Sequence, residues 1–171
     1  MAYQKLQVSL SLPIIPSDSV RIPNPDTLVT SNTDGNGAVS GTFSSAASTF
    51  ITDRVIPGAI IYATTKAYEV LSVDSETSLT VTVADGALPA GATVFQIYNE
   101  ATPGCILFVG IAGNVSMQLA QQNGQQKIEY LFKNIADASF LPTQVVRVGS
   151  GLGTGAGGQA TTTAENIIGL W

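Results

Sequence analysis

Hydrophobic and polar residues alternate over short stretches of this chain, and the first such stretch lies near its N-terminus. From Lys5 to Leu12 every second residue is apolar. Successive side chains of a β-strand point to opposite faces, whereas a helix would scatter these leucines around its surface. The pattern therefore predicts a half-buried strand whose buried face carries Leu6, Val8, Leu10 and Leu12.

The same strand signal recurs along most of the chain, without a sustained helical stripe. Residues 67–73 and 78–84 alternate and are joined by a short polar segment, which predicts a hairpin with one buried face. Short strands separated by glycine and asparagine turns are typical of an all-β antiparallel sandwich or jelly roll, and not of a parallel α/β sheet. The further predicted strands are AIIYAT, TVFQIYN, CILFVG, NVSMQL, KIEYLF, FLPTQVVRV and ENIIGLW.

Two stretches interrupt this pattern. Four prolines lie between residues 13 and 25. Because each proline removes a backbone donor and fixes φ, they predict an extended arm that runs along a surface and stays out of the middle of a sheet. Residues 27–43 are rich in Ser, Thr, Asn and Gly, which favours turns with one weak strand.

Composition and charge narrow the range of partners. Of the 171 residues, 44% are hydrophobic and 11% are charged. This composition can bury a core, and it leaves a neutral polar surface that suits packing against other subunits. The net charge of −5 and the scattered basic residues argue against a nucleic-acid partner. We expect no membrane partner either, because no apolar run reaches the roughly 20 residues of a membrane span.

The residue types that usually carry catalysis are missing or isolated. The chain has no histidine, and its twelve carboxylates lie singly in turns and at strand ends. Residues 32–37 imitate a calcium loop, but Phe43 stands where a bidentate glutamate is needed. The tract 149–159 spells a dinucleotide fingerprint without a βα unit to follow it. We therefore expect no enzyme, cofactor or metal site, two plain glycine-rich loops, and a buried, inert Cys105.

Four segments of the chain carry a resemblance through their shared order: YQKLQVSLSLPIIPSDSVRIPNPD, PGCILFVGIAGNVSM, FKNIADASFLPTQVVRV and ENIIGLW. In this order they resemble the small virion structural proteins of tailed phages, including the head-spike base proteins of gene transfer agents. Between them, FITDRVIPGAIIYATTKAYEVLSVDSETSLTVTV and ATVFQIYN look like a small β-barrel that is inserted into larger phage members of this type.

The resemblance implies one β-sandwich domain with an inserted lobe. Residues 1–26 would form the N-terminal strand and arm of the sandwich, residues 27–101 the inserted β-barrel lobe, and residues 102–171 the remainder of the sandwich. The first strand would pair with the strand around Val145 and Val148, or with a neighbouring subunit. The apolar C-terminus is expected to place Trp171 in a buried position.

The implied function is that of a non-enzymatic virion structural protein, a capsid decoration or cement protein or a head-spike base. Its partners would be the major capsid protein or other virion subunits, and it would reside in the virion after assembly in the host cytoplasm. The low charge and the N-terminal arm predict a cyclic homo-oligomer, with a trimer favoured over a pentamer. The residues expected at its interfaces are Leu6, Val8, Leu10, Pro13, Ile14, Ile15, Pro16, Ile22 and Trp171.

A second class of function stays open at this point. The chain could be a tail- or fibre-associated adhesin module that binds a glycan of the host surface, with exposed tyrosines as platforms. The candidates are Tyr62, Tyr68, Tyr98 and Tyr130. They lie in strand patterns, which favours packing in a core or an interface over glycan binding.

Overall fold

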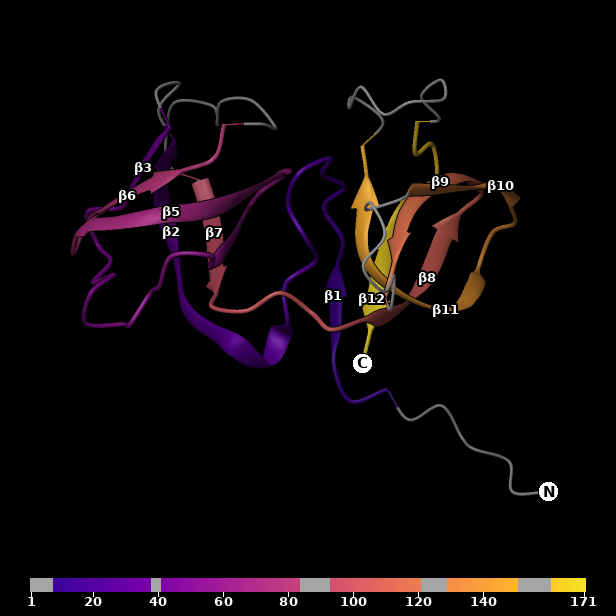
Figure 1. Ribbon diagram of the computed structural model, residues 1–171, viewed down its shortest axis with the longest axis horizontal. Coiled ribbons are helices and arrows are strands. Elements are labelled where there is room, and N and C mark those ends of the chain that lie inside the picture. Colours follow the sequence, from indigo (N-terminus) through magenta and orange to yellow (C-terminus); the bar gives the residue numbers. More distant parts are fainter. Residues whose placement is uncertain (1–7, 38–40, 84–92, 121–128, 151–160) are drawn as a thin grey trace.

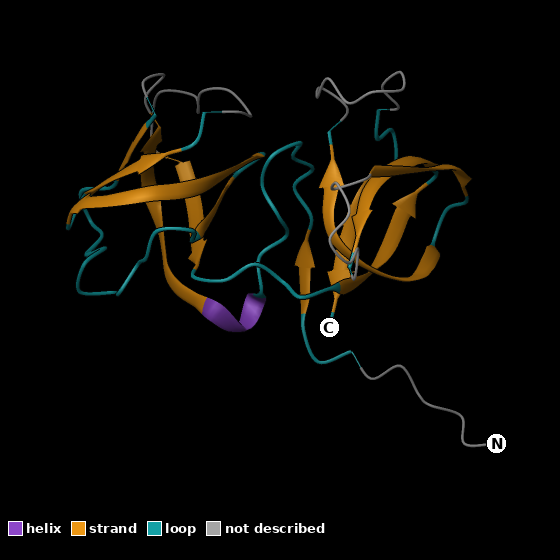
Figure 2. Cartoon of the chain, viewed as in Figure 1, coloured by secondary structure: helices purple, strands orange, loops and turns teal. Residues whose placement is uncertain are grey.

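The computed structural model describes residues 8–37, 41–83, 93–120, 129–150 and 161–171. These residues form two antiparallel β units that lie side by side, a closed barrel and a six-stranded sheet (Figure 1). The predicted all-β fold with a sandwich-like unit and a barrel lobe is confirmed. Among these described residues the helical element is the 3-10 turn at Pro25–Thr27, drawn in purple in Figure 2.

The barrel is built from strands that follow one another in sequence. Neighbouring strands around it are β2-β3-β6-β5-β4-β7, and β2 pairs with β7 to close it. Closure removes the free edges that an open sheet would expose. The strands are β2 (Leu28–Gly37), β3 (Thr42–Ser44), β4 (Ile60–Ala63), β5 (Lys66–Ser75), β6 (Ser78–Val81) and β7 (Thr93–Tyr98).

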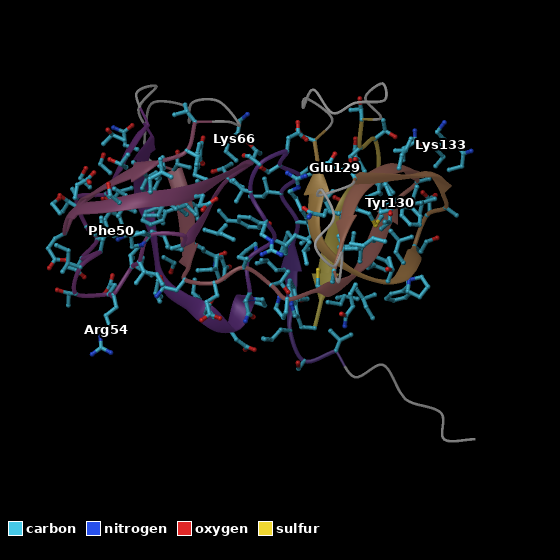
Figure 3. All side chains as sticks on the ribbon, in the orientation of Figure 1. Phe50, Arg54, Lys66, Glu129, Tyr130 and Lys133 are labelled. Atoms are coloured by element: carbon cyan, nitrogen blue, oxygen red, sulfur yellow. The ribbon has the colours of Figure 1, made fainter. Side chains whose placement is uncertain are left out.

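Three phenylalanines occupy the centre of the barrel. The rings of Phe43 and Phe95 meet edge to face with centroids 4.9 Å apart, and Phe50 packs beside both. Phe50 lies within this lobe, whereas Arg54 projects from the loop that follows it (Figure 3). A Cβ at Gly35 would stand 2.7 Å from Cδ1 of Phe95, so the close packing requires a glycine there.

The first barrel strand corrects one expectation. Residues 27–43 were expected to form turns with one weak strand, yet β2 is a ten-residue strand that includes the calcium-loop imitation. Its neighbours β7 and β3 supply the ladder hydrogen bonds, and register shifts absorb its irregularities. The Asp34 carboxylate serves the fold, because it accepts hydrogen bonds from the Ser45 hydroxyl and the Ala47 N–H.

The second unit is a six-stranded sheet in the order β1-β12-β8-β11-β9-β10. Strand β11 changes partner along its length, because its first part pairs with β8 and its last part with β9. Because β11 is shared, the strands that pair with its two ends, β8 and β9, enclose the core of this unit between them. The strands are β1 (Ser11–Pro13), β8 (Cys105–Ile111), β9 (Gly113–Leu119), β10 (Glu129–Ile135), β11 (Ser139–Gly149) and β12 (Glu165–Leu170).

The sheet collects its strands from both sides of the barrel sequence. The segment that leaves the sheet for the barrel and the segment that returns from it lie side by side, and Pro23 and Ala101 form an isolated β-bridge between them. Hydrogen bonds flank this crossing, from the Asn24 N–H to the Glu100 carbonyl and from the Thr102 N–H to the Ile22 carbonyl. The two connections between sheet and barrel therefore run as a short antiparallel pair.

Candidate interaction surface

The N-terminal arm lies against the C-terminal strand. Strand β1 pairs with β12. The Trp171 carbonyl accepts hydrogen bonds from the N–H groups of Ser9 and Leu10, and the Trp171 N–H donates to the Leu10 carbonyl. The expected pairing with the strand around Val145 and Val148 is not observed for β1, because β8 and β9 already pair with that part of β11. The arm reaches β11 only later, where the N–H groups of Ser17 and Ile22 donate to the carbonyls of Val148 and Val146.

The residues expected at an interface fall into three groups. Ile14 and Ile22 are buried in the core of the sheet. Ile15 packs against a second buried cluster, which we call the cluster between the two lobes because it joins residues of the arm to residues of the barrel: Leu12, Val20, Ile60, Tyr62, Ala67 and Tyr98. Val8 and Pro13 are exposed, while Leu10 and Pro16 are partly exposed. Leu6 lies outside the described residues. Pro13 is therefore one of the few of these positions that is free to meet a partner and also sits in a strand.

Trp171 lies between the two lobes and is not fully buried in either core. Its ring packs against both the core of the sheet and the cluster between the lobes. The indole N–H donates a 2.8 Å hydrogen bond to Oγ1 of Thr102, which lies on the connection returning from the barrel. The side chain keeps intermediate exposure, so the expected full burial is not reached.

An ionic network fixes the arm to the sheet. The Arg147 guanidinium on β11 donates to the backbone carbonyl of Asp18 and pairs with the Glu129 carboxylate on β10. The Ser116 hydroxyl donates to the second Glu129 oxygen at 3.3 Å, and the Asp18 carboxylate accepts the Ser150 N–H at 2.7 Å. These charged groups stabilise the fold, because each one bonds to a neighbouring strand, to the arm or to the backbone that follows β11.

The solvent-facing side of the sheet carries apolar residues in register. Pro13 stands opposite Ile168, Ile168 opposite Phe108, and Phe108 opposite Phe140, so one row crosses four strands. The Phe108 and Phe140 rings are 5.1 Å apart, and Phe140 is 56% exposed. We call this side the outer face; its described positions are Ser11, Pro13, Ile106, Phe108, Gly110, Phe140, Asn166, Ile168 and Leu170.

Most of the outer face was missed as a candidate site, although the sequence held a signal for it. The run CILFVG has apolar residues at consecutive positions, as does ENIIGLW. In a strand, such a run makes both faces apolar. Cys105, Leu107 and Val109 occupy the core, which leaves Ile106 and Phe108 on the outer face.

A pocket of about 330 Å³ opens between the arm and the barrel. Its floor is the outside of β4 and β7, where Tyr62 stands opposite Gln96, and its wall is the arm, including Pro13. The Tyr98 hydroxyl donates to Oε1 of Gln96 at 2.9 Å, which orients the amide. The lining is uncharged: Leu12, Pro13, Ile15, Tyr62, Thr64, Val94, Phe95 and Gln96.

The described residues hold no group of three carboxylates or thiols that could bind a metal ion. Burial raises the pKa of the Cys105 thiol to about 12, so this sulfur stays protonated and a poor nucleophile. Burial also raises the pKa of Tyr62, and its contact with the Ile15 backbone only partly opposes the shift.

Three of the four candidate glycan-binding tyrosines are unavailable. Tyr62, Tyr68 and Tyr98 are buried, whereas Tyr130 on β10 is 43% exposed. Tyr130 lies on the sheet lobe, and Lys133 projects farther along the same strand (Figure 3). A single exposed tyrosine does not make the row of platforms that the adhesin reading needs.

The described residues contain no helix long and apolar enough to cross a membrane. Searches of the chain against protein-family models, curated proteins and solved structures gave no significant match.

Proposed function

We propose that this chain is a non-enzymatic structural protein of a tailed-phage particle, a capsid decoration or cement protein or a head-spike base that binds other virion subunits. The observation that carries the proposal is the outer face of the sheet. Two adjacent rows of it are aligned across the strands and hold large apolar side chains without a charge among the described positions. Contiguous exposed apolar surface of this kind marks sites of protein association.

The physical advantage of covering this face is appreciable. Removing apolar surface from water stabilises a complex by roughly 25 cal/mol per Å², and a fully buried Phe side chain contributes about 1.5–3 kcal/mol. Phe140 still exposes more than half of its surface, so a partner can gain a large part of this contribution. Many copies on a particle would multiply weak contacts into stable attachment.

The proposed location in a phage particle rests on the sequence resemblance to phage virion proteins. The proposed mode of binding rests on the outer face of the sheet. The polar network around Arg147 is internal, so recognition would rest on shape and apolar contact. The adhesin alternative is weaker, because its aromatic candidates are largely buried. We propose the major capsid protein or an adjacent virion subunit as partner and the assembled virion as location.

Incorporation into particles tests the proposal. Particles assembled with Phe140→Ser should contain about one tenth or less of the amount of this chain found in wild-type particles. We expect truncation of this exposed aromatic anchor to cost about 1.4 kcal/mol or more, which is a factor of ten in affinity. Leu71→Ser is the matched control, because Leu71 is 54% exposed on the barrel strand β5 and lies off the outer face. Quantitative mass spectrometry of purified particles provides the measurement.

Two results would count against the proposal. Absence of the wild-type chain from purified particles would refute a virion role. Equal retention of the Phe140→Ser and wild-type chains would show that the outer face does not attach this protein, whatever its location. Circular dichroism of both serine variants confirms that the exposed substitutions leave the fold intact.

A further inference from the structure

We propose that the outer face is the contact between two copies of this chain, with Phe140 of each copy entering the pocket beside Pro13 of the other. The inference rests on the proposed function, since it takes a second copy of this chain as the adjacent virion subunit that covers the outer face. It concerns how two surfaces of one chain fit each other.

Phe140 has the properties of a protruding anchor. It is the outermost member of the row on β11, it is 56% exposed, and the Phe108 ring supports it from one side. Aromatic side chains lose little conformational freedom on binding and dominate the energetics of interfaces. An anchor of this kind needs an apolar recess on its partner.

The pocket between arm and barrel is such a recess, and it begins at the other end of the same row. Pro13 belongs both to the outer face and to the lining of the pocket. The volume of about 330 Å³ lies at the lower end of the range of roughly 300–1,000 Å³ for ligand pockets, which suits one aromatic side chain and its flanks. Gln96 and Thr64 offer hydrogen-bonding groups at its floor and rim for the backbone beside that side chain.

The order of the row makes these two features self-complementary. Three strand spacings of about 4.8 Å separate Pro13 from Phe140, or roughly 14 Å. A two-fold axis that runs along the strands, midway between β12 and β8, turns a second copy face down and reverses its row. Phe140 of each copy then lies over Pro13 of the other, which is the reciprocal contact that a two-fold interface requires.

Charge also favours a second copy as the occupant. The chain carries a net charge of −5, so contact between two copies through charged surface would bring like charges together. The described positions of the outer face and of the pocket lining are all uncharged. Face-to-face contact therefore avoids this repulsion. The arrangement places two copies at this interface, where the sequence pattern favoured three.

Site-specific cross-linking tests the reciprocal contact directly. Two single variants, Phe140→Cys and Pro13→Cys, each carry one exposed thiol, because Cys105 is buried. With a short bis-maleimide, a mixture of the two should give a covalent dimer containing one copy of each. Leu71→Cys is the control and should not cross-link to either. Cross-linking of Phe140→Cys only to itself would overturn the arrangement. That result would mean that Phe140 of one copy faces Phe140 of the other, so the two-fold axis would run along the row and not along the strands.

Light scattering tests whether the contact forms in solution. We expect the wild-type chain to be dimeric at micromolar concentration, Phe140→Ser to dimerise at least about tenfold more weakly, and Leu71→Ser to match the wild type. A wild-type chain that stays monomeric would overturn the inference. If such a monomer still entered particles and Phe140→Ser did not, the proposed function would stand and the second copy alone would be refuted.

Discussion

The hydrogen bond between Trp171 and Thr102 offers a quantitative test of how the chain ends are fastened. Thr102 is almost fully buried, and its Oγ1 accepts the indole N–H at 2.8 Å and the Gly104 N–H at 3.1 Å. Thr102→Val keeps the shape of the side chain and removes this acceptor. The indole N–H and the Gly104 N–H then lose their acceptor, and both hydrogen bonds lie in part-buried positions.

The size of the effect follows from these contacts. A donor left without a partner in a buried site costs about 1–3 kcal/mol, so we expect Thr102→Val to lower the free energy of unfolding by roughly 2 kcal/mol. Trp171→Phe removes the indole N–H together with part of the apolar contact, and we expect a loss of about 1–2 kcal/mol. The double variant should lose less than the sum, because the second substitution removes a bond already absent.

Urea unfolding followed by far-UV circular dichroism measures all four chains of this cycle. We expect a coupling energy of about 1 kcal/mol between the two positions. Tryptophan emission adds a check on Thr102→Val, since the sole tryptophan reports on this site. Additivity within about 0.3 kcal/mol would refute the reasoning, because the hydrogen bond would then contribute nothing to the fastening.

Three further outcomes are expected from single features of the fold. Gly35→Ala should destabilise the barrel by about 1–3 kcal/mol in thermal unfolding, because its Cβ would stand 2.7 Å from Cδ1 of Phe95; an unchanged midpoint would contradict this packing. Hydrogen bonds to Thr and Ser groups lower the pKa of the Asp74 and Glu76 carboxyls below their ordinary 3.8 and 4.5. The unfolded chain therefore binds more protons in acid, so stability should be constant above these values and decrease as pH falls below them. Replacing both carboxyls by their amides should flatten the midpoint-against-pH curve; a curve as steep as the wild type's would assign the acid sensitivity elsewhere. Arg147→Met should cost about 2 kcal/mol and accelerate amide exchange in the arm, whereas unchanged exchange would show that the ionic network does not hold it.

Many strand positions were predictable because they depend on local alternation, but the first strand was not. Of the described part of the stretch predicted from Lys5 to Leu12, only Ser11 and Leu12 lie in strand β1, and Val8, expected on the buried face, is 43% exposed. The strands predicted at 67–73 and 78–84 correspond to the hairpin of β5 (Lys66–Ser75) and β6 (Ser78–Val81), and residue 84 lies outside the described residues. Tyr68, Val70 and Leu79 are buried, as a period of two requires. Strand β2 could not be recognised in this way. Its Ser, Thr, Asn and Gly residues favour turns locally, and only the ladders from β3 and β7 hold them extended.

Pairing between distant strands was beyond what alternation can specify. The leucines of the N-terminal strand require some apolar neighbour, but nothing local distinguishes β12 from β11 as the partner. The same limit applies to the candidate site. The consecutive apolar residues around Phe108 reveal a two-sided strand, but the alignment of Phe140, Phe108, Ile168 and Pro13 exists only once four strands are in register.

The antiparallel bridge between Pro23 and Ala101 makes the barrel an insertion that could be replaced without changing the sheet. Because the outgoing and returning chains are bridge partners, their ends lie about one strand spacing, roughly 5 Å, apart. A turn of two residues could span that gap without disturbing the order of strands in the sheet. Evolution could therefore lengthen, shorten or exchange the intervening segment while the connectivity of the sheet stayed constant. The constraint on such exchange is the apolar contact of Tyr62 and Tyr98 with the arm, which any replacement would have to cover.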